Sequence, residues 1–234
     1  MENLDQIATI IAMTMGVAWA SGINLYATIL VLGFLGASGH MVLPPDLMIL
    51  TDPLILFAAG AMYLVEFFAD KVPGVDSSWD TLHTFIRIPA GAALAVGAVG
   101  EVDPVVALAV AIVGGGLTAG THATKAGSRV LINASPEPFS NWFASVTEDL
   151  VVVGGLFAAL YNPWLFLVLL VLFIVLMIWL LPKILRGVKL VFTALISFLR
   201  GGKKPVAAEV PPPIPSELPV LEPKEGLESR PDEK

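Results

Sequence analysis

One uninterrupted apolar run constrains this chain more than any other feature of its sequence. Trp164 to Leu181 contains no charged or strongly polar side chain, and about 18 consecutive apolar residues are enough for a helix to cross a bilayer. The rest of the 234 residues agrees with this run: 56% are hydrophobic and only 14% charged, whereas soluble domains carry about 25% charged residues. The sequence therefore predicts an integral membrane protein and excludes a soluble globular enzyme.

Further apolar segments precede this run. The first, Ile7 to Leu35, would exceed about 40 Å as one straight helix. We expect a break at Ser21–Asn24, where freed backbone groups can be satisfied again. The other spans are expected at residues 53–70, 79–99, 105–132, 140–160 and 163–181. The predicted fold is an all-α polytopic membrane helix bundle of six to seven spans with broken helices, the number depending on whether the first segment crosses once or as two pieces.

Composition divides the chain into three regions. Residues 1–182 form the expected transmembrane helical domain. Residues 183–200 are a basic amphipathic segment that can lie along an anionic leaflet; the alternative is a plain extension of the last helix. Residues 201–234 are rich in proline and poor in large apolar residues, and we expect this acidic tail to be disordered.

The positions of lysine and arginine predict the orientation. Lys71, Arg129 and the basic residues of 183–200 lie near three connections, whereas the linker 38–52 and the turn 100–104 carry acids and neither Lys nor Arg. Basic residues favour the cytoplasmic side, so we expect a cytoplasmic C-terminus. The net charge of −7 and the lack of a basic face exclude nucleic acid as a partner. We expect membrane lipids to surround the protein, and the sequence leaves open whether it forms a homo-oligomer.

A weak internal repeat has an offset of 63 residues. Pro73 and Trp79 correspond to Pro136 and Trp142, and each pair precedes an apolar stretch. The same offset sets Glu66 against Arg129. Membrane transporters are often built from such repeats, with the binding site at the repeat interface.

The most informative residues are polar side chains inside the predicted spans. Several recur at spacings of three, four or seven, which places them on one helix face. An ionised group at the bilayer centre costs about 2.5–3.5 kcal/mol or more, so these faces should point inward and pair. The predicted pathway residues are Asn24, Glu66, Asp70, Asp76, Asp80, His83, Arg87, His122, Lys125, Arg129, Asn133, Asn141, Glu148 and Asp149. Either His83 or His122 is a candidate proton carrier near neutral pH.

The sequence offers little to support catalysis or a cofactor. It has no cysteine, which removes thiolate metal sites and cysteine nucleophiles. Gly114–Gly116 lacks the Gly-Lys-Ser/Thr ending of a phosphate-binding loop, and neither HExxH nor Gly-x-Ser-x-Gly occurs. We therefore expect no enzyme activity, no cofactor and no metal site.

Several long sequence segments resemble those of a known family. They include Ala20-Ser21-Gly22-Ile23-Asn24-Leu25-Tyr26-Ala27-Thr28, Val65-Glu66-Phe67-Phe68-Ala69-Asp70-Lys71-Val72-Pro73-Gly74-Val75-Asp76 and His122-Ala123-Thr124-Lys125-Ala126-Gly127. In this order they resemble the bacterial integral membrane family catalogued as Domain of Unknown Function 4126, over roughly residues 15–185. The resemblance implies a compact multi-span domain, hence the bacterial inner membrane, and brings no assigned activity.

The function predicted from these features is a small transporter or channel for a small polar or ionic solute, with proton coupling as an option. Two alternatives stay open. The charged residues can form a satisfied ion-pair network that only fixes helix registry. The chain can also be a non-transporting membrane scaffold that recruits partners through the basic segment and the tail.

Overall fold

The computed structural model describes residues 2–72, 74–134 and 138–199, and these ranges contain helices and turns but no strand. The elements are α1 (Glu2–Ile23), α2 (Leu25–Ala37), the 3₁₀ helix η1 (Pro45–Thr51), α3 (Pro53–Ala69), α4 (Val75–Val99), α5 (Pro104–Asn133), α6 (Pro138–Tyr161) and α7 (Pro163–Leu199). Several of them begin with proline, whose fixed φ suits the first helical position and which has no N–H to lose there. The predicted all-α helix bundle is confirmed.

Five helices in the described ranges are long and apolar enough to cross a membrane, namely α1, α4, α5, α6 and α7. The bent pair of η1 and α3, which meet at 68°, would make a sixth span. The structure thus supports the lower end of the expected six to seven. A seventh is not available, because the 13 residues of α2 reach only about 20 Å.

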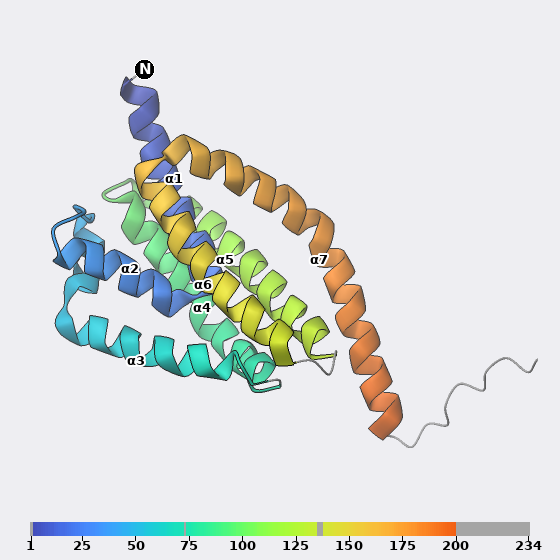
Figure 1. Ribbon diagram of the computed structural model, residues 1–234. Helices are drawn as coiled ribbons and strands as arrows, with labels where there is room; N and C mark the ends of the chain where they lie inside the picture. Colours follow the sequence, from blue (N-terminus) through green and yellow to red (C-terminus); the bar gives the residue numbers. More distant parts are fainter. Residues whose placement is uncertain (1, 73, 135–137, 200–234) are drawn as a thin grey trace, which may run out of the picture.

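The predicted break in the first segment lies at Asn24. Its backbone is extended, with φ −146° and ψ 100°, and its side chain accepts a hydrogen bond from Ala27 N at 3.0 Å. Asn24 therefore ends α1 and caps α2, which is a favoured use of asparagine. Figure 1 shows the change of direction, because α2 leaves the line of α1.

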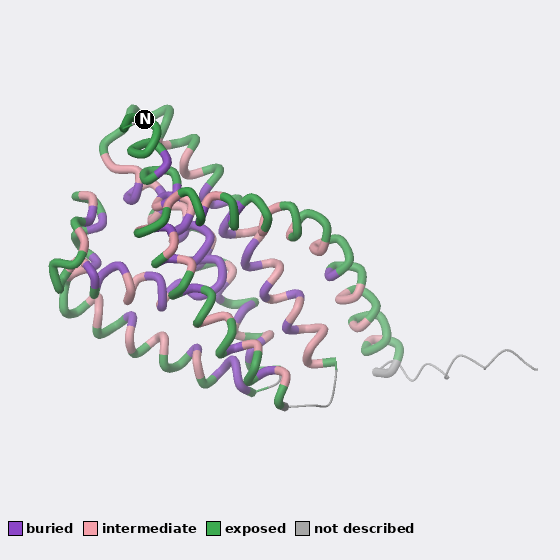
Figure 2. The backbone as a smooth tube through the Cα atoms, turned by 45° about the horizontal axis from the view of Figure 1, so that its top comes forward, coloured by how far each residue is buried: buried purple, intermediate pink, exposed green. Residues whose placement is uncertain are grey.

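Helix α1 lies at the centre of the bundle. Every residue from Gly16 to Leu25 is buried, and α1 contacts α4, α5, α6 and α7. Gly22 permits the closest approach, because a Cβ there would lie 2.6 Å from the backbone oxygen of Thr118 on α5. Figure 2 shows the contrast between this buried inner helix and the exposed outer surface of α7.

Helix α7 continues through Pro182 to Leu199 without interruption. Gly120 of α5 lies against Met177, and Gly127 lies against Ile184, so α5 and α7 run parallel. The boundary expected at residue 182 is therefore not a helix end. Residues 183–199 continue the helix, and their position along an anionic leaflet stays a prediction. α7 bends along its length (Figure 1). The predicted tail, 201–234, lies outside the described residues.

The two halves of the predicted repeat are both helical hairpins, α3–α4 and α5–α6. Asn133 at the end of α5 donates to Asp76 at the start of α4, so the two turns lie at the same end of the bundle. Pro73 and Pro136, on which the repeat was partly based, lie outside the described residues.

Candidate functional site

Eight of the predicted pathway residues meet in one buried cluster, which we call the charge network. They come from the end of α3, the first half of α4, the last third of α5 and the first half of α6. The members are Glu66, Asp70, Asp80, Arg87, His122, Lys125, Arg129 and Glu148. All are buried except Glu148, whose side chain is 20% exposed. Periodicity explains the convergence, since helical spacings of three, four and seven put these residues on inward faces.

Lys125 lies at the centre of the network. Its Nζ is 3.1 Å from Glu66 Oε1, 3.2 Å from Asp70 Oδ2, 3.6 Å from Glu148 Oε2 and 3.8 Å from Asp80 Oδ1. One ammonium group therefore faces four carboxylates from three helices. This arrangement offsets the cost of burying a lysine, because an unpaired ammonium in a bilayer is strongly disfavoured.

Arg87 forms one side of the network. Its guanidinium forms an ion pair with Glu66 and donates to Asp80 Oδ1 at 3.3 Å. It also donates to the backbone oxygen of Ile23 at 3.2 Å, and Lys125 donates to the same oxygen at 3.1 Å. That carbonyl ends α1 because the helix breaks at Asn24, so the break supplies an acceptor to two buried cations, as broken membrane helices do at ion sites.

Arg129 forms the other side. It donates from Nε and Nη2 to the two oxygens of Glu148, at 3.1 and 2.6 Å. This fork geometry is the strongest way for arginine to pair with a carboxylate. Nη1 donates to the backbone oxygens of Asp70 and Asn141 at 3.0 and 3.2 Å. Arg129 thus ties α5 to the ends of α3 and α6.

The charges of the network do not balance. Four carboxylates face three cationic side chains, so the network carries one surplus negative charge when every group is ionised and His122 is neutral. Within the described part of the chain, three carboxylate oxygens are buried without a hydrogen-bond partner: Glu66 Oε2, Asp70 Oδ1 and Asp80 Oδ2. In each of these carboxylates the other oxygen lies within 4 Å of two cations. The unpartnered acceptor oxygens therefore belong to the same network that carries the surplus negative charge.

The hydrogen bonds of His122 favour a neutral ring. Nε2 lies 3.1 Å from the backbone oxygen of Asp80, which can only accept, so Nε2 carries the hydrogen. Nδ1 lies 3.3 Å from Arg87 Nη1, which can only donate. His83 lies apart from the network, with Nδ1 at 2.9 Å from the oxygen of Trp79 and Nε2 at 3.1 Å from Tyr26 Oη. The candidate role of His83 and His122 as proton carriers stays a prediction.

The remaining predicted residues form two polar groups beside the network. Asn24 donates to Asp149 Oδ1 at 3.1 Å, and Tyr63 donates to Asp149 Oδ2 at 2.9 Å. At the turns, Asn133 Nδ2 donates to both oxygens of Asp76 at 2.7 and 2.9 Å, and Asn133 Oδ1 accepts from Asn141 Nδ2 at 2.7 Å. The structure therefore gives every predicted residue a polar partner.

Sequence reasoning missed several partners. Tyr63 lies three residues before Glu66 on α3 and shares its helix face, so the spacing rule could have identified it. Thr84, 2.8 Å from His122 Nε2, lies four residues after Asp80 and was detectable in the same way. The Ile23 carbonyl gives no signal in side-chain patterns, because only the three-dimensional break exposes it.

A groove reaches the exposed end of the network. It has a volume of 180 Å³ and runs between α1, α5, α6 and α7. Its lining includes Thr121, Lys125, Ser128, Thr147 and Glu148. Among residues 2–72, 74–134 and 138–199, no group of three or more His, Asp or Glu side chains is arranged to hold a metal ion.

Comparison with known proteins assigns a family and no activity. Residues 11–183 match the family described as a domain of unknown function, DUF4126, which covers the charge network and most of the described helices. No curated protein and no solved structure matches the chain.

Proposed function

We propose that this chain, which belongs to the family described as Domain of Unknown Function 4126, is a proton-coupled membrane transporter or channel for a small polar or ionic solute. The proposal rests on the charge network. A surplus charge inside a membrane protein is expensive unless a counter-charge neutralises it. A proton shared among the carboxylates is the smallest species that removes this cost.

The single observation that carries the proposal is the coincidence of surplus charge with unpartnered oxygens. Glu66, Asp70 and Asp80 each use one oxygen for two cations and leave the other without a donor. A purely structural network is expected to satisfy its buried acceptors. An unsatisfied acceptor in each of three adjacent carboxylates is what a site for an exchangeable proton requires.

The geometry also suggests how such a proton can be coupled to a solute. Lys125 lies within 4 Å of four carboxylates, so protonation of one of them releases Lys125 toward the others without a large movement. Glu148 connects the network to the groove, because it is the partly exposed member. A solute that binds near Glu148 therefore shares Lys125 and Arg129 with the proton site.

The test is proton uptake into proteoliposomes that enclose a pH-sensitive dye. Full-length protein is reconstituted, a potassium diffusion potential (negative inside) is imposed, and uptake is recorded alone and with acetate, glycine, ammonium or inorganic phosphate outside. We expect uptake above that of empty liposomes under at least one condition, and at least a tenfold loss in Glu66→Gln. This variant keeps the acceptor that Arg87 and Lys125 use and removes the surplus charge.

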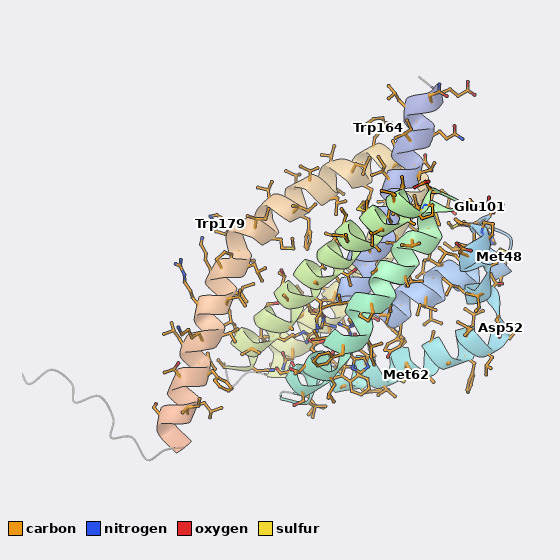
Figure 3. The ribbon with its side chains drawn as sticks, turned by 180° about the vertical axis from the view of Figure 1, so that it is seen from behind. Met48, Asp52, Met62, Glu101, Trp164 and Trp179 are labelled. Atoms are coloured by element: carbon orange, nitrogen blue, oxygen red, sulfur yellow. The ribbon has the colours of Figure 1, made fainter. Side chains whose placement is uncertain are left out.

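Glu101→Gln is the matched control. Glu101 is exposed in the turn between α4 and α5, beyond the end of α4 that is remote from the network (Figure 3). Uptake should be unchanged in this variant and after deletion of residues 201–234. Wild-type uptake equal to that of empty liposomes under every condition, or equal uptake in Glu66→Gln and wild type, would contradict transport. Loss of uptake on tail deletion from an intact bundle would contradict the proposal that the helix bundle alone carries transport.

A further inference from the structure

Beside the groove lies an apolar cavity that the proposed transport mechanism does not use. It has a volume of 310 Å³, within the range of about 300–1,000 Å³ typical of ligand pockets. α1, α6 and α7 enclose it. The lining residues are Trp19, Val151, Gly154, Gly155, Ala158, Phe166, Leu169, Leu170 and Phe173.

The cavity and the groove adjoin each other. Val151 and Phe173 line both of them, so the apolar cavity lies next to a groove whose lining includes threonine, serine and the exposed end of the charge network. An apolar cavity beside a groove with polar side chains matches an amphiphile with a chain and a headgroup.

Glycines open the cavity toward the bilayer. Gly154 is exposed, and a Cβ there would meet no atom within 4 Å. Gly155 lets the Trp19 ring lie directly on α6, since a Cβ there would be 2.3 Å from that ring. Trp19 in turn packs edge-on against Phe166 and Phe173, at 5.9 Å in each case. The result is a cavity with an aromatic wall and an opening on α6.

The groove offers two acceptors to a headgroup that carries N–H hydrogens. Glu148, whose side chain is 20% exposed, is its carboxylate. Thr121 also lines the groove, is 2% exposed, and has an Oγ1 without a partner. An ammonium group can donate to Glu148 and to Thr121 Oγ1.

We propose that this paired cavity is a binding site for an aminolipid, with an acyl chain in the apolar cavity and a primary ammonium headgroup at Glu148 and Thr121.

Quenching of Trp19 fluorescence tests the proposal. Trp79, Trp142, Trp164 and Trp179 are replaced by Phe in the full chain, so that Trp19 is the one reporter, and the protein is placed in phosphatidylcholine vesicles. These vesicles contain a minor fraction of either phosphatidylethanolamine or phosphatidylglycerol with brominated acyl chains. We expect the brominated phosphatidylethanolamine to quench Trp19 with at least about fivefold higher apparent affinity.

Two glycines supply a matched pair of variants. Gly154→Phe fills the cavity and should abolish quenching. Gly116→Phe should leave quenching unchanged, because Gly116 is also exposed with no atom within 4 Å of its Cβ position but lines neither compartment. Thr121→Val removes only an unpartnered hydroxyl and should reduce the preference for phosphatidylethanolamine without loss of thermal stability.

Three results would overturn the site. The first is equal quenching by both brominated lipids, which means that a chain enters without recognition of its headgroup. The second is unchanged quenching in Gly154→Phe, which means that the bromine atoms reach Trp19 by another path. The third is no quenching at all.

Discussion

Replacement of Lys125 by methionine is expected to destabilise the protein severely, because it removes the cation on which the network converges. At an effective dielectric constant of about 20, a unit charge pair 3.1–3.2 Å apart attracts by about 5 kcal/mol, and Glu66 and Asp70 lie at these distances from Nζ. Desolvation cancels part of this, and loss of one partner from a buried ion pair costs about 3–5 kcal/mol net. For a chain of this size, we expect a fall in melting temperature of roughly 6–20 °C.

The assay is thermal unfolding of purified protein in a zwitterionic detergent, with Lys183→Met as the control. Lys183 is exposed and its Nζ lies over the ring of Trp179, a cation–π contact of about 0.5–1 kcal/mol. The double variant Glu66→Gln with Lys125→Met should recover part of the loss, because it restores the original charge balance. A melting temperature of Lys125→Met no lower than that of Lys183→Met would refute the idea that Lys125 neutralises the network.

Other expectations concern the helix contacts, the break and the orientation. Gly22→Ala should lower the free energy of unfolding by about 1–3 kcal/mol, since its Cβ would lie 2.6 Å from a backbone oxygen of α5. Gly116→Ala should leave the free energy of unfolding unchanged or raise it by about 0.5–1 kcal/mol, because the added Cβ meets no atom. Equal melting temperatures of the two variants would contradict this. Asn24→Ala should lose about 1–2 kcal/mol with the α2 cap, measured by denaturant unfolding; no change would show that the break does not need the cap. In a chain without native cysteine, Glu101→Cys should react with an impermeant maleimide in intact cells and Ser78→Cys only after permeabilisation, and the reverse pattern would invert the proposed orientation.

The sequence was sufficient to predict which segments are helical, but not the length and arrangement of every helix. Apolar runs, prolines and glycines placed the main spans close to α3–α7, and Ser21–Asn24 identified the break, because these are local preferences of the backbone. The length of α7 was left open, since Pro182 normally interrupts a helix and a continuous helix was the alternative. In the structure the helix continues, and Gly127 and Gly187 of the two parallel helices lie against Ile184 and Leu131.

The members of the candidate site were predictable, but their pairing was not. Charged side chains inside apolar spans must converge in a folded bundle, so periodicity placed the eight residues of the network among the fourteen predicted from the sequence. Which carboxylate meets which cation depends on helix rotation and depth, and no periodicity encodes either. The Ile23 carbonyl and the three unpartnered oxygens follow only from coordinates, and the proton-coupling proposal rests on those oxygens.

The pH dependence of stability tests the surplus charge most directly. If the folded network retains one proton that the unfolded chain releases, the unfolded state binds one proton fewer, and the free energy of unfolding falls by about 1.4 kcal/mol per pH unit as pH rises. The window is about pH 7.5–9, above the ordinary histidine pKa of about 6.5, so that histidines contribute little. We expect this slope in the wild type and a slope near zero in Glu66→Gln, whose network is neutral without a proton. A flat wild-type profile, or the same slope in both proteins, would contradict a proton held by the charge network.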